Sequence, residues 1–213
     1  MNVTKDKISS VFFHYSIPAV LGMLAISSAN IVDGFFIGNY VGDFGLAAIN
    51  ISFPIFSLLF GFALMLAIGS SVVSGKLIGQ GDIKSASIIF SKTMVCITLF
   101  SFITCTGLFL NIETILHLFG ADENLTKIAI DYLSVILIFI PFLMIGVVLD
   151  YFVRVDNRPN LAFIALLSSA LINVILDWFL IVYLQKGIFG AALATGISQL
   201  ALIFILLPHF FSK

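Results

Sequence analysis

The stretch Leu46–Ser74, LAAINISFPIFSLLFGFALMLAIGSSVVS, decides the fold class of this chain. It contains no charged residue, and it is longer than the ~20 apolar residues that an α-helix needs to cross a bilayer. Its apolar side chains are distributed around the whole helix rather than along one stripe, which is typical of a helix surrounded by lipid and other helices. Because a segment in lipid must satisfy its own backbone hydrogen bonds, we expect this stretch to be a transmembrane helix.

The rest of the chain has the same character. Of its 213 residues, 61% are hydrophobic and only 10% are charged, whereas soluble domains have about 45–50% apolar and about 25% charged residues. The sequence therefore predicts an all-α integral membrane protein, a six-transmembrane-helix bundle forming a single membrane domain over residues 1–213. Its spans are expected at approximately 12–37, 46–74, 87–110, 128–149, 161–183 and 190–211.

The distribution of lysine and arginine predicts the orientation, since cytoplasmic loops carry an excess of these residues. If the N-terminus is cytoplasmic, two basic residues, Lys127 and Lys186, lie on the outer side. The other eight lie on the cytoplasmic side, namely Lys5, Lys7, Lys76, Lys84, Lys92, Arg154, Arg158 and Lys213. We therefore expect both termini in the cytoplasm.

Two carboxylates fall inside predicted spans. Asp33 lies in the first span, in the stretch NIVDGFFI, and Asp177 lies in the fifth, in NVILDW. Ionisable residues in a membrane are costly and are functional-site candidates by default. The alternative for Asp33 is an interfacial carboxylate that reaches water. Asn173 precedes Asp177 by four residues, so both lie on one helix face.

Polar residues of the other spans fall at the same depth. Thr195 on the sixth span and Tyr132 on the fourth lie in one layer of the outer half of the membrane with Asp33, Asn173 and Asp177. Two neighbouring carboxylates in a low dielectric cannot both stay ionised without a counter-charge, so they favour binding a proton or a cation. Carboxylate, amide and hydroxyl oxygens suit a hard cation such as Na⁺. The sequence leaves the choice between Na⁺ and H⁺ open.

Other features have plainer interpretations. Asp150 and Asp131 fall at predicted helix ends, where we expect them to be solvated. Pro18 lies inside the first span, where proline removes a backbone donor and bends helices. A net charge of −1 gives no reason to expect nucleic acid as a partner. Because the chain has no zinc motif, nucleophile triad or phosphate loop, we expect neither an enzyme nor a bound cofactor.

The chain resembles the N-terminal lobe of multidrug and toxic compound extrusion (MATE) transporters. The similarity extends over essentially the whole chain, through the order and spacing of several stretches. These stretches are IPAVL at residues 17–21, NIVDGFFIG at 30–38, LAAI at 46–49, GKLIGQGD at 75–82, NVILD at 173–177 and GIFGAALAT at 187–195.

The resemblance implies a plasma-membrane antiporter, in bacteria of the inner membrane, that exports lipophilic organic cations in exchange for Na⁺ or H⁺. The family's cation-site residues correspond to Asp33, Asn173, Asp177 and Thr195, and Tyr132 is added from its depth. The bend of the first helix in some members corresponds to Pro18.

Length is the departure from the family pattern. Family members have two six-helix lobes around a central cavity, whereas this sequence has six spans. The resemblance therefore implies a second lobe elsewhere or a parallel homodimer, which an axis along the membrane normal allows. Two alternatives remain, a lipid or polysaccharide flippase of the same superfamily and a non-transporting half-length membrane partner. A flippase would favour a basic cavity, and no Lys or Arg lies deep in a predicted span.

Overall fold

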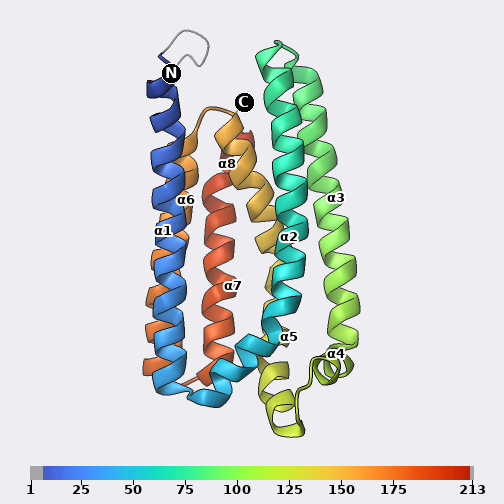
Figure 1. Cartoon of the computed structure of the whole chain (residues 1–213), viewed down its shortest axis with the longest axis vertical. Helices are drawn as coiled ribbons and strands as arrows, with labels where there is room; N and C mark the ends of the chain where they lie inside the picture. The colour runs from blue at the N-terminus through green and yellow to red at the C-terminus, as the bar shows by residue number, and fades with distance from the viewer. Residues whose placement is uncertain (1–6, 212–213) are drawn as a thin grey trace.

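A computed structural model describes residues 7–211, and Lys5 and Lys213 of the predicted orientation lie outside this range. The described chain is helical throughout (Figure 1). Six of its helical segments are long and apolar enough to cross a membrane. The elements are α1 (Ile8–Tyr40), α2 (Asp43–Gly79), α3 (Ile83–Leu110), α4 (Ile112–Leu118), α5 (Glu123–Val155), α6 (Pro159–Asp177), η1 (Trp178–Tyr183), α7 (Gly187–Leu206) and α8 (Pro208–Phe211).

The helices extend beyond the apolar segments from which the spans were predicted. α2, for example, covers Asp43–Gly79, and its connection to α1 consists of Val41 and Gly42 alone. Gly42 has φ of 90°, a left-handed conformation that glycine adopts without a steric penalty. The polar ends continue as helix because helices satisfy their backbone donors outside the bilayer as well as within it.

α5 is the central helix of the bundle. It packs against α2, α3 and α7, and most of its membrane-spanning window is buried. α1 packs mainly on α6, and Figure 1 shows this pair on the opposite side of α7 from α2 and α3. The faces of α1, α2 and α3 that point away from the bundle expose large apolar side chains, as expected for contact with lipid.

Small residues allow the helices to approach closely. Small residues occupy the two ends of the buried face of α2, namely Ala48 and Ser52 at one end and Ala63, Ala67 and Ser71 at the other. Close approach of this kind is typical of membrane helix interfaces, where van der Waals packing replaces the hydrophobic effect. α1 remains helical through Pro18, whose ring is buried.

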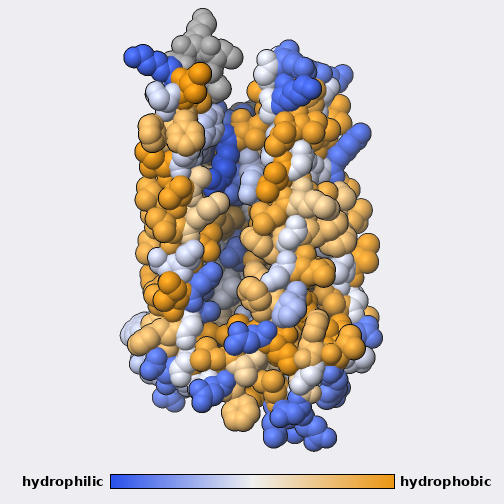
Figure 2. Space-filling view, in the orientation of Figure 1, coloured by the Kyte–Doolittle hydropathy of each residue, from blue (hydrophilic) through white to orange (hydrophobic). Residues whose placement is uncertain are grey.

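The surface matches a membrane protein. Figure 2 shows a broad hydrophobic band with hydrophilic residues gathered at both ends of the molecule. The same view shows a hollow between α1 and α2 whose interior is more hydrophilic than the surrounding surface. A polar recess therefore opens within an otherwise apolar face.

The prediction for Asp150 was wrong. α5 continues to Val155, so Asp150 lies within the helix and is buried rather than solvated. Its two carboxylate oxygens accept hydrogen bonds from Arg154 Nε and Nη2 at 3.0 and 3.1 Å. The two residues are four apart, and the bidentate pair satisfies the buried charge within one helix.

Candidate cation site

Asp177 is the last residue of α6 and is fully buried. Neither of its carboxylate oxygens has a hydrogen-bond partner among the described residues. Burying an unpartnered carboxylate is strongly unfavourable, so such groups are normally paired, protonated or bound to a cation. Asp177 therefore presents two free oxygen ligands inside the bundle.

Asp33 supplies a second carboxylate from α1. One of its oxygens, Oδ1, is also buried without a hydrogen-bond partner among the described residues. α1 packs against α6, and this contact brings Asp33 and Asp177 into electrostatic interaction with each other. Two acids that are well separated in the sequence thus lie on two helices that pack together, and two neighbouring negative charges repel more strongly in a low dielectric than in water.

Tyr132 of α5 is the third member of this group. Its phenol interacts electrostatically with both carboxylates, and its ring packs against an apolar cluster. The buried members of that cluster are Ile37, Ile181, Ile188 and Ala191. Ile37 follows Asp33 by four residues, and Ile181 follows Asp177 by four, so the cluster lies about one helical turn beyond the carboxylates.

The two remaining candidates, Asn173 and Thr195, lie on α6 and α7, respectively. Asn173 is buried one turn before Asp177 on the same helix. Thr195 is half-buried and borders a cavity of about 10 Å³ between α2, α5 and α7, next to Phe56 and Phe139. A hydrogen bond connects α6 and α7, since Ser169 Oγ donates to the Ser198 carbonyl oxygen at 2.8 Å.

The donor set fits a proton or a hard cation. All of the candidate ligands are oxygens, from two carboxylates, an amide, a hydroxyl and a phenol. Oxygen-only sites suit hard cations, whereas softer transition metals favour nitrogen and sulfur. Among residues 7–211, no group of three or more His, Cys, Asp or Glu side chains forms a metal cluster.

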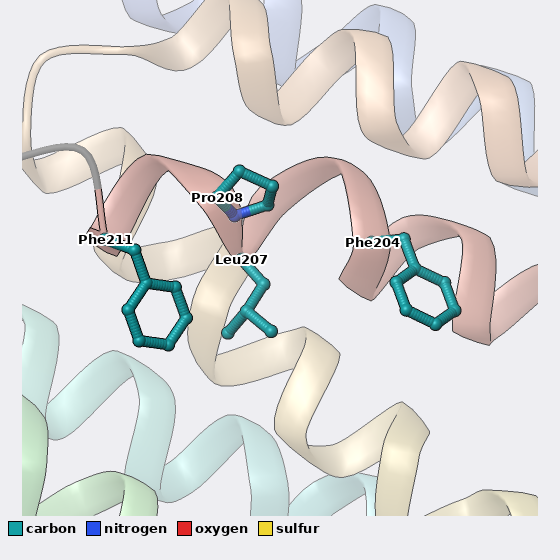
Figure 3. A pocket seen from close by; sticks show the side chains of 4 residues that line it. All are labelled: Phe204, Leu207, Pro208 and Phe211. Atoms are coloured by element: carbon teal, nitrogen blue, oxygen red, sulfur yellow. The ribbon is translucent and has the colours of Figure 1, made fainter.

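A larger pocket lies apart from the carboxylates. It has a volume of about 360 Å³ and is lined by Phe204, Leu207, Pro208 and Phe211, at the end of α7 and in α8. Phe204, Leu207 and Phe211 project to the same side (Figure 3). None of the lining side chains has a polar group, so this pocket offers no ligand for a cation.

One element next to the site was not predicted from the sequence. After Asp177 the chain continues as a π-helix, η1, over Trp178–Tyr183. The apolar segment 161–183 predicts a single helix because hydropathy does not distinguish an α-helical turn from a π-helical turn. Gly190 on α7 lies against the backbone of η1 at Leu180, a contact that the sequence does not reveal.

Comparisons with known proteins identify the family. The MatE family model matches residues 18–179. The multidrug export protein MepA of Staphylococcus saprophyticus is 30% identical over 209 residues, which are 96% of this chain and 46% of that protein. The chain therefore spans about half the length of the curated relatives that it matches.

Solved structures agree with this assignment. The crystal structure of MATE in complex with MaD3S has a TM-score of 0.89 at 24% identity, covering 94% of this chain and 45% of that one. An outward-facing multidrug resistance MATE family transporter of the MOP superfamily has a TM-score of 0.88 at 25% identity, over 94% and 45%. These relatives are transporters, and with its six apolar helices this chain is a multi-pass protein of the plasma membrane. The chain belongs to the MATE family of multidrug efflux transporters.

Proposed function

We propose that this chain forms the cation-binding half of an antiporter that exports lipophilic organic cations in exchange for Na⁺ or H⁺. In this proposal Asp33 and Asp177 hold the coupling ion, and Asn173, Thr195 and Tyr132 contribute further oxygens. Pro18 provides a point at which α1 bends during the transport cycle. Both termini lie in the cytoplasm.

The observation that carries the proposal is a set of three buried carboxylate oxygens without a hydrogen-bond partner among the described residues, Asp33 Oδ1 and both oxygens of Asp177. A captured cation or proton removes the repulsion between the two acids and satisfies these oxygens. The acids lie on different helices, α1 and α6. Ion capture therefore changes the free energy of α1–α6 packing, which gives a physical basis for coupling ion binding to helix movement.

Charge favours a cationic substrate over an anionic one. Among the described residues, the buried Asp177 and the half-buried Asp33 have no basic partner, while the buried Asp150 has Arg154. An acidic recess within apolar walls attracts lipophilic cations. The same balance of charge counts against a flippase for anionic head groups.

Export also requires a second six-helix lobe, because the substrate cavity of the family lies between two lobes. The relatives are about twice the length that this chain covers. We propose that a further polypeptide segment or a second copy of this chain supplies that lobe. A parallel arrangement around an axis along the membrane normal would then enclose the cavity.

The test is efflux of ethidium, a lipophilic organic cation, from cells that express the chain. We expect Asp33→Asn to abolish efflux because the amide cannot exchange a proton or neutralise Na⁺. The matched control is Asp131→Asn, at an exposed acid on α5, and it should leave efflux unchanged. Efflux above the vector background from this chain alone would indicate that a second copy suffices as the other lobe. Wild-type efflux by Asp33→Asn would remove Asp33 from the mechanism.

A further inference from the structure

The π-helix η1 begins at the residue that follows Asp177. Its hydrogen bonds run from one residue to the fifth along the chain, as in Leu184 N–H to the Phe179 carbonyl oxygen at 2.9 Å. π-helical turns are rare and are found frequently at functional sites, because they change the direction of neighbouring side chains. The position of η1 beside a buried carboxylate therefore requires an explanation.

The buried residues of α6 and η1 include a series at every fourth position, Ala165, Ser169, Asn173, Asp177 and Ile181, and beside it a second series of Ala162, Leu166 and Ala170. In an α-helix a four-residue step overshoots a full turn by about 40°, so such a series drifts around the helix. In the wider π turn four residues fall short of a full turn, which reverses the drift. The π turn thus keeps Ile181 on the buried side together with Asp177.

Contacts on both sides hold η1 in place. Ile181 packs against Ile37 of α1 and Ala191 of α7. At Gly190 a Cβ atom would lie 3.2 Å from the backbone carbonyl carbon of Leu180, so glycine lets α7 lie directly against η1. The Leu180 carbonyl oxygen also accepts a hydrogen bond from Lys186 N–H at 2.9 Å.

We propose that η1 is a positioning element that aims Asp177 at Asp33, and that ion capture by the two carboxylates alters its π turn. This inference rests on the proposed cation site. Without the extra residue of the π turn, Ile181 would rotate away from its contacts with α1 and α7 while Asp177 stays buried. Because η1 follows Asp177 directly and is held by contacts with α1 and α7, a change in the force on Asp177 acts on η1 first.

Trp178, the single tryptophan of the chain, gives a direct signal for this turn. Its ring stacks on Tyr183 at a centroid distance of 6.3 Å and an interplanar angle of 24°. The two residues are five apart, and in an α-helix residues five apart point about 140° away from each other. The stacking therefore depends on the π turn, and Trp178 emission should change if the turn changes.

The experiment measures two quantities on the purified chain, the apparent melting temperature and the Trp178 emission. Both are titrated with NaCl against choline chloride at constant ionic strength, and with pH from 5.5 to 8.5 in choline chloride. If the proposal is correct, Na⁺ or acid raises the melting temperature and shifts the emission with the same midpoint. Asp33→Asn should abolish both responses.

Deletion of Phe179 tests the π turn itself, since removing one residue converts it to an α-helical turn. We expect the deletion to abolish the ion-dependent rise in melting temperature, whereas Phe179→Ala, which removes only the side chain, retains it. Where the deletion variant does not fold, Gly190→Ala replaces it and should weaken the response. An ion-dependent melting temperature with constant Trp178 emission overturns this inference and leaves the cation site standing. If neither ion changes the wild-type melting temperature, the cation site fails, and the inference fails with it.

Discussion

Two buried aspartates of this chain have opposite surroundings. Asp150 accepts two hydrogen bonds from Arg154, whereas Asp177 has no partner for either oxygen among the described residues. A paired carboxylate contributes to the fold, and removing one partner of a buried pair costs about 3–5 kcal/mol. An unpartnered carboxylate destabilises the fold and is retained only where it serves another purpose. At the residue scale, therefore, the lack of a hydrogen-bond partner distinguishes Asp177, the candidate ligand, from Asp150, whose pair with Arg154 belongs to the fold.

This difference predicts how the Asp177→Asn substitution changes the thermal stability of the protein. The amide keeps the shape of the side chain but removes a buried charge, whose cost without a partner exceeds about 1–3 kcal/mol. We expect a higher melting temperature than wild type in Na⁺-free buffer at pH 8, at about 2–4 °C per kcal/mol for a chain of this size. The measurement is thermal unfolding in detergent, with exposed Asp131→Asn as the control. A lower melting temperature for Asp177→Asn would show that the carboxylate has a stabilising partner.

At the scale of elements, close packing of α7 against α5 fixes the position of the polar layer. Gly196 follows Thr195 on α7, and a Cβ atom there would overlap the ring of Phe139 on α5. Gly146 of α5 has a similar role, since a Cβ atom there would lie 2.9 Å from Leu202 of α7. These glycines allow the two helices to approach closely enough to enclose the layer.

Gly196→Ala tests this packing. Overpacking a close interface typically costs about 1–3 kcal/mol, so we expect a lower melting temperature. Gly61→Ala is the matched control, because Gly61 is an exposed helical glycine on α2 with open space around its Cβ position. There, alanine should stabilise the helix by about 0.5–1 kcal/mol relative to glycine. Equal effects of the two substitutions would contradict the role of Gly196 in the α5–α7 contact.

At the scale of the whole molecule, the orientation of the chain determines which surface of the membrane lies closer to the two carboxylates. The Asp82 side chain caps α3 by accepting a hydrogen bond from Ser85 N–H at 3.0 Å. Hydrogen bonding with the Ser85 side chain, and then with Ser85 N–H, lowers the pKa of Asp82. The cap lies between α2 and α3, at the end of the bundle where lysines predict the cytoplasm. Lys186, between η1 and α7, belongs to the predicted outer side.

Cysteine labelling in intact cells tests this orientation. Cys96 and Cys105 are first replaced by serine and alanine, respectively, and single cysteines are introduced as Gln80→Cys and Lys186→Cys. Both positions are exposed and lie outside the helices. We expect a membrane-impermeant maleimide to label Lys186→Cys in intact cells and Gln80→Cys only after permeabilisation. The reverse pattern would place both termini on the outside.

Much of the architecture follows from the sequence. The six membrane-crossing helices are predictable because hydropathy is a local property, and the length of an apolar segment is set by bilayer thickness. Asp33 and Asp177 are recognisable as candidate ligands because charge in an apolar segment is costly wherever that segment packs. The burial of Asp150 was missed because α5 continues beyond the apolar segment that marked its end.

Only the tertiary structure decides which polar groups meet. The interaction of Asp33 with Asp177 depends on α1 packing against α6, a contact between segments far apart in the chain. The π turn after Asp177 likewise depends on simultaneous contacts of Ile181 with α1 and α7. Such arrangements are set by steric fit between helices. Hydropathy along one segment does not record which side of a helix faces which neighbour.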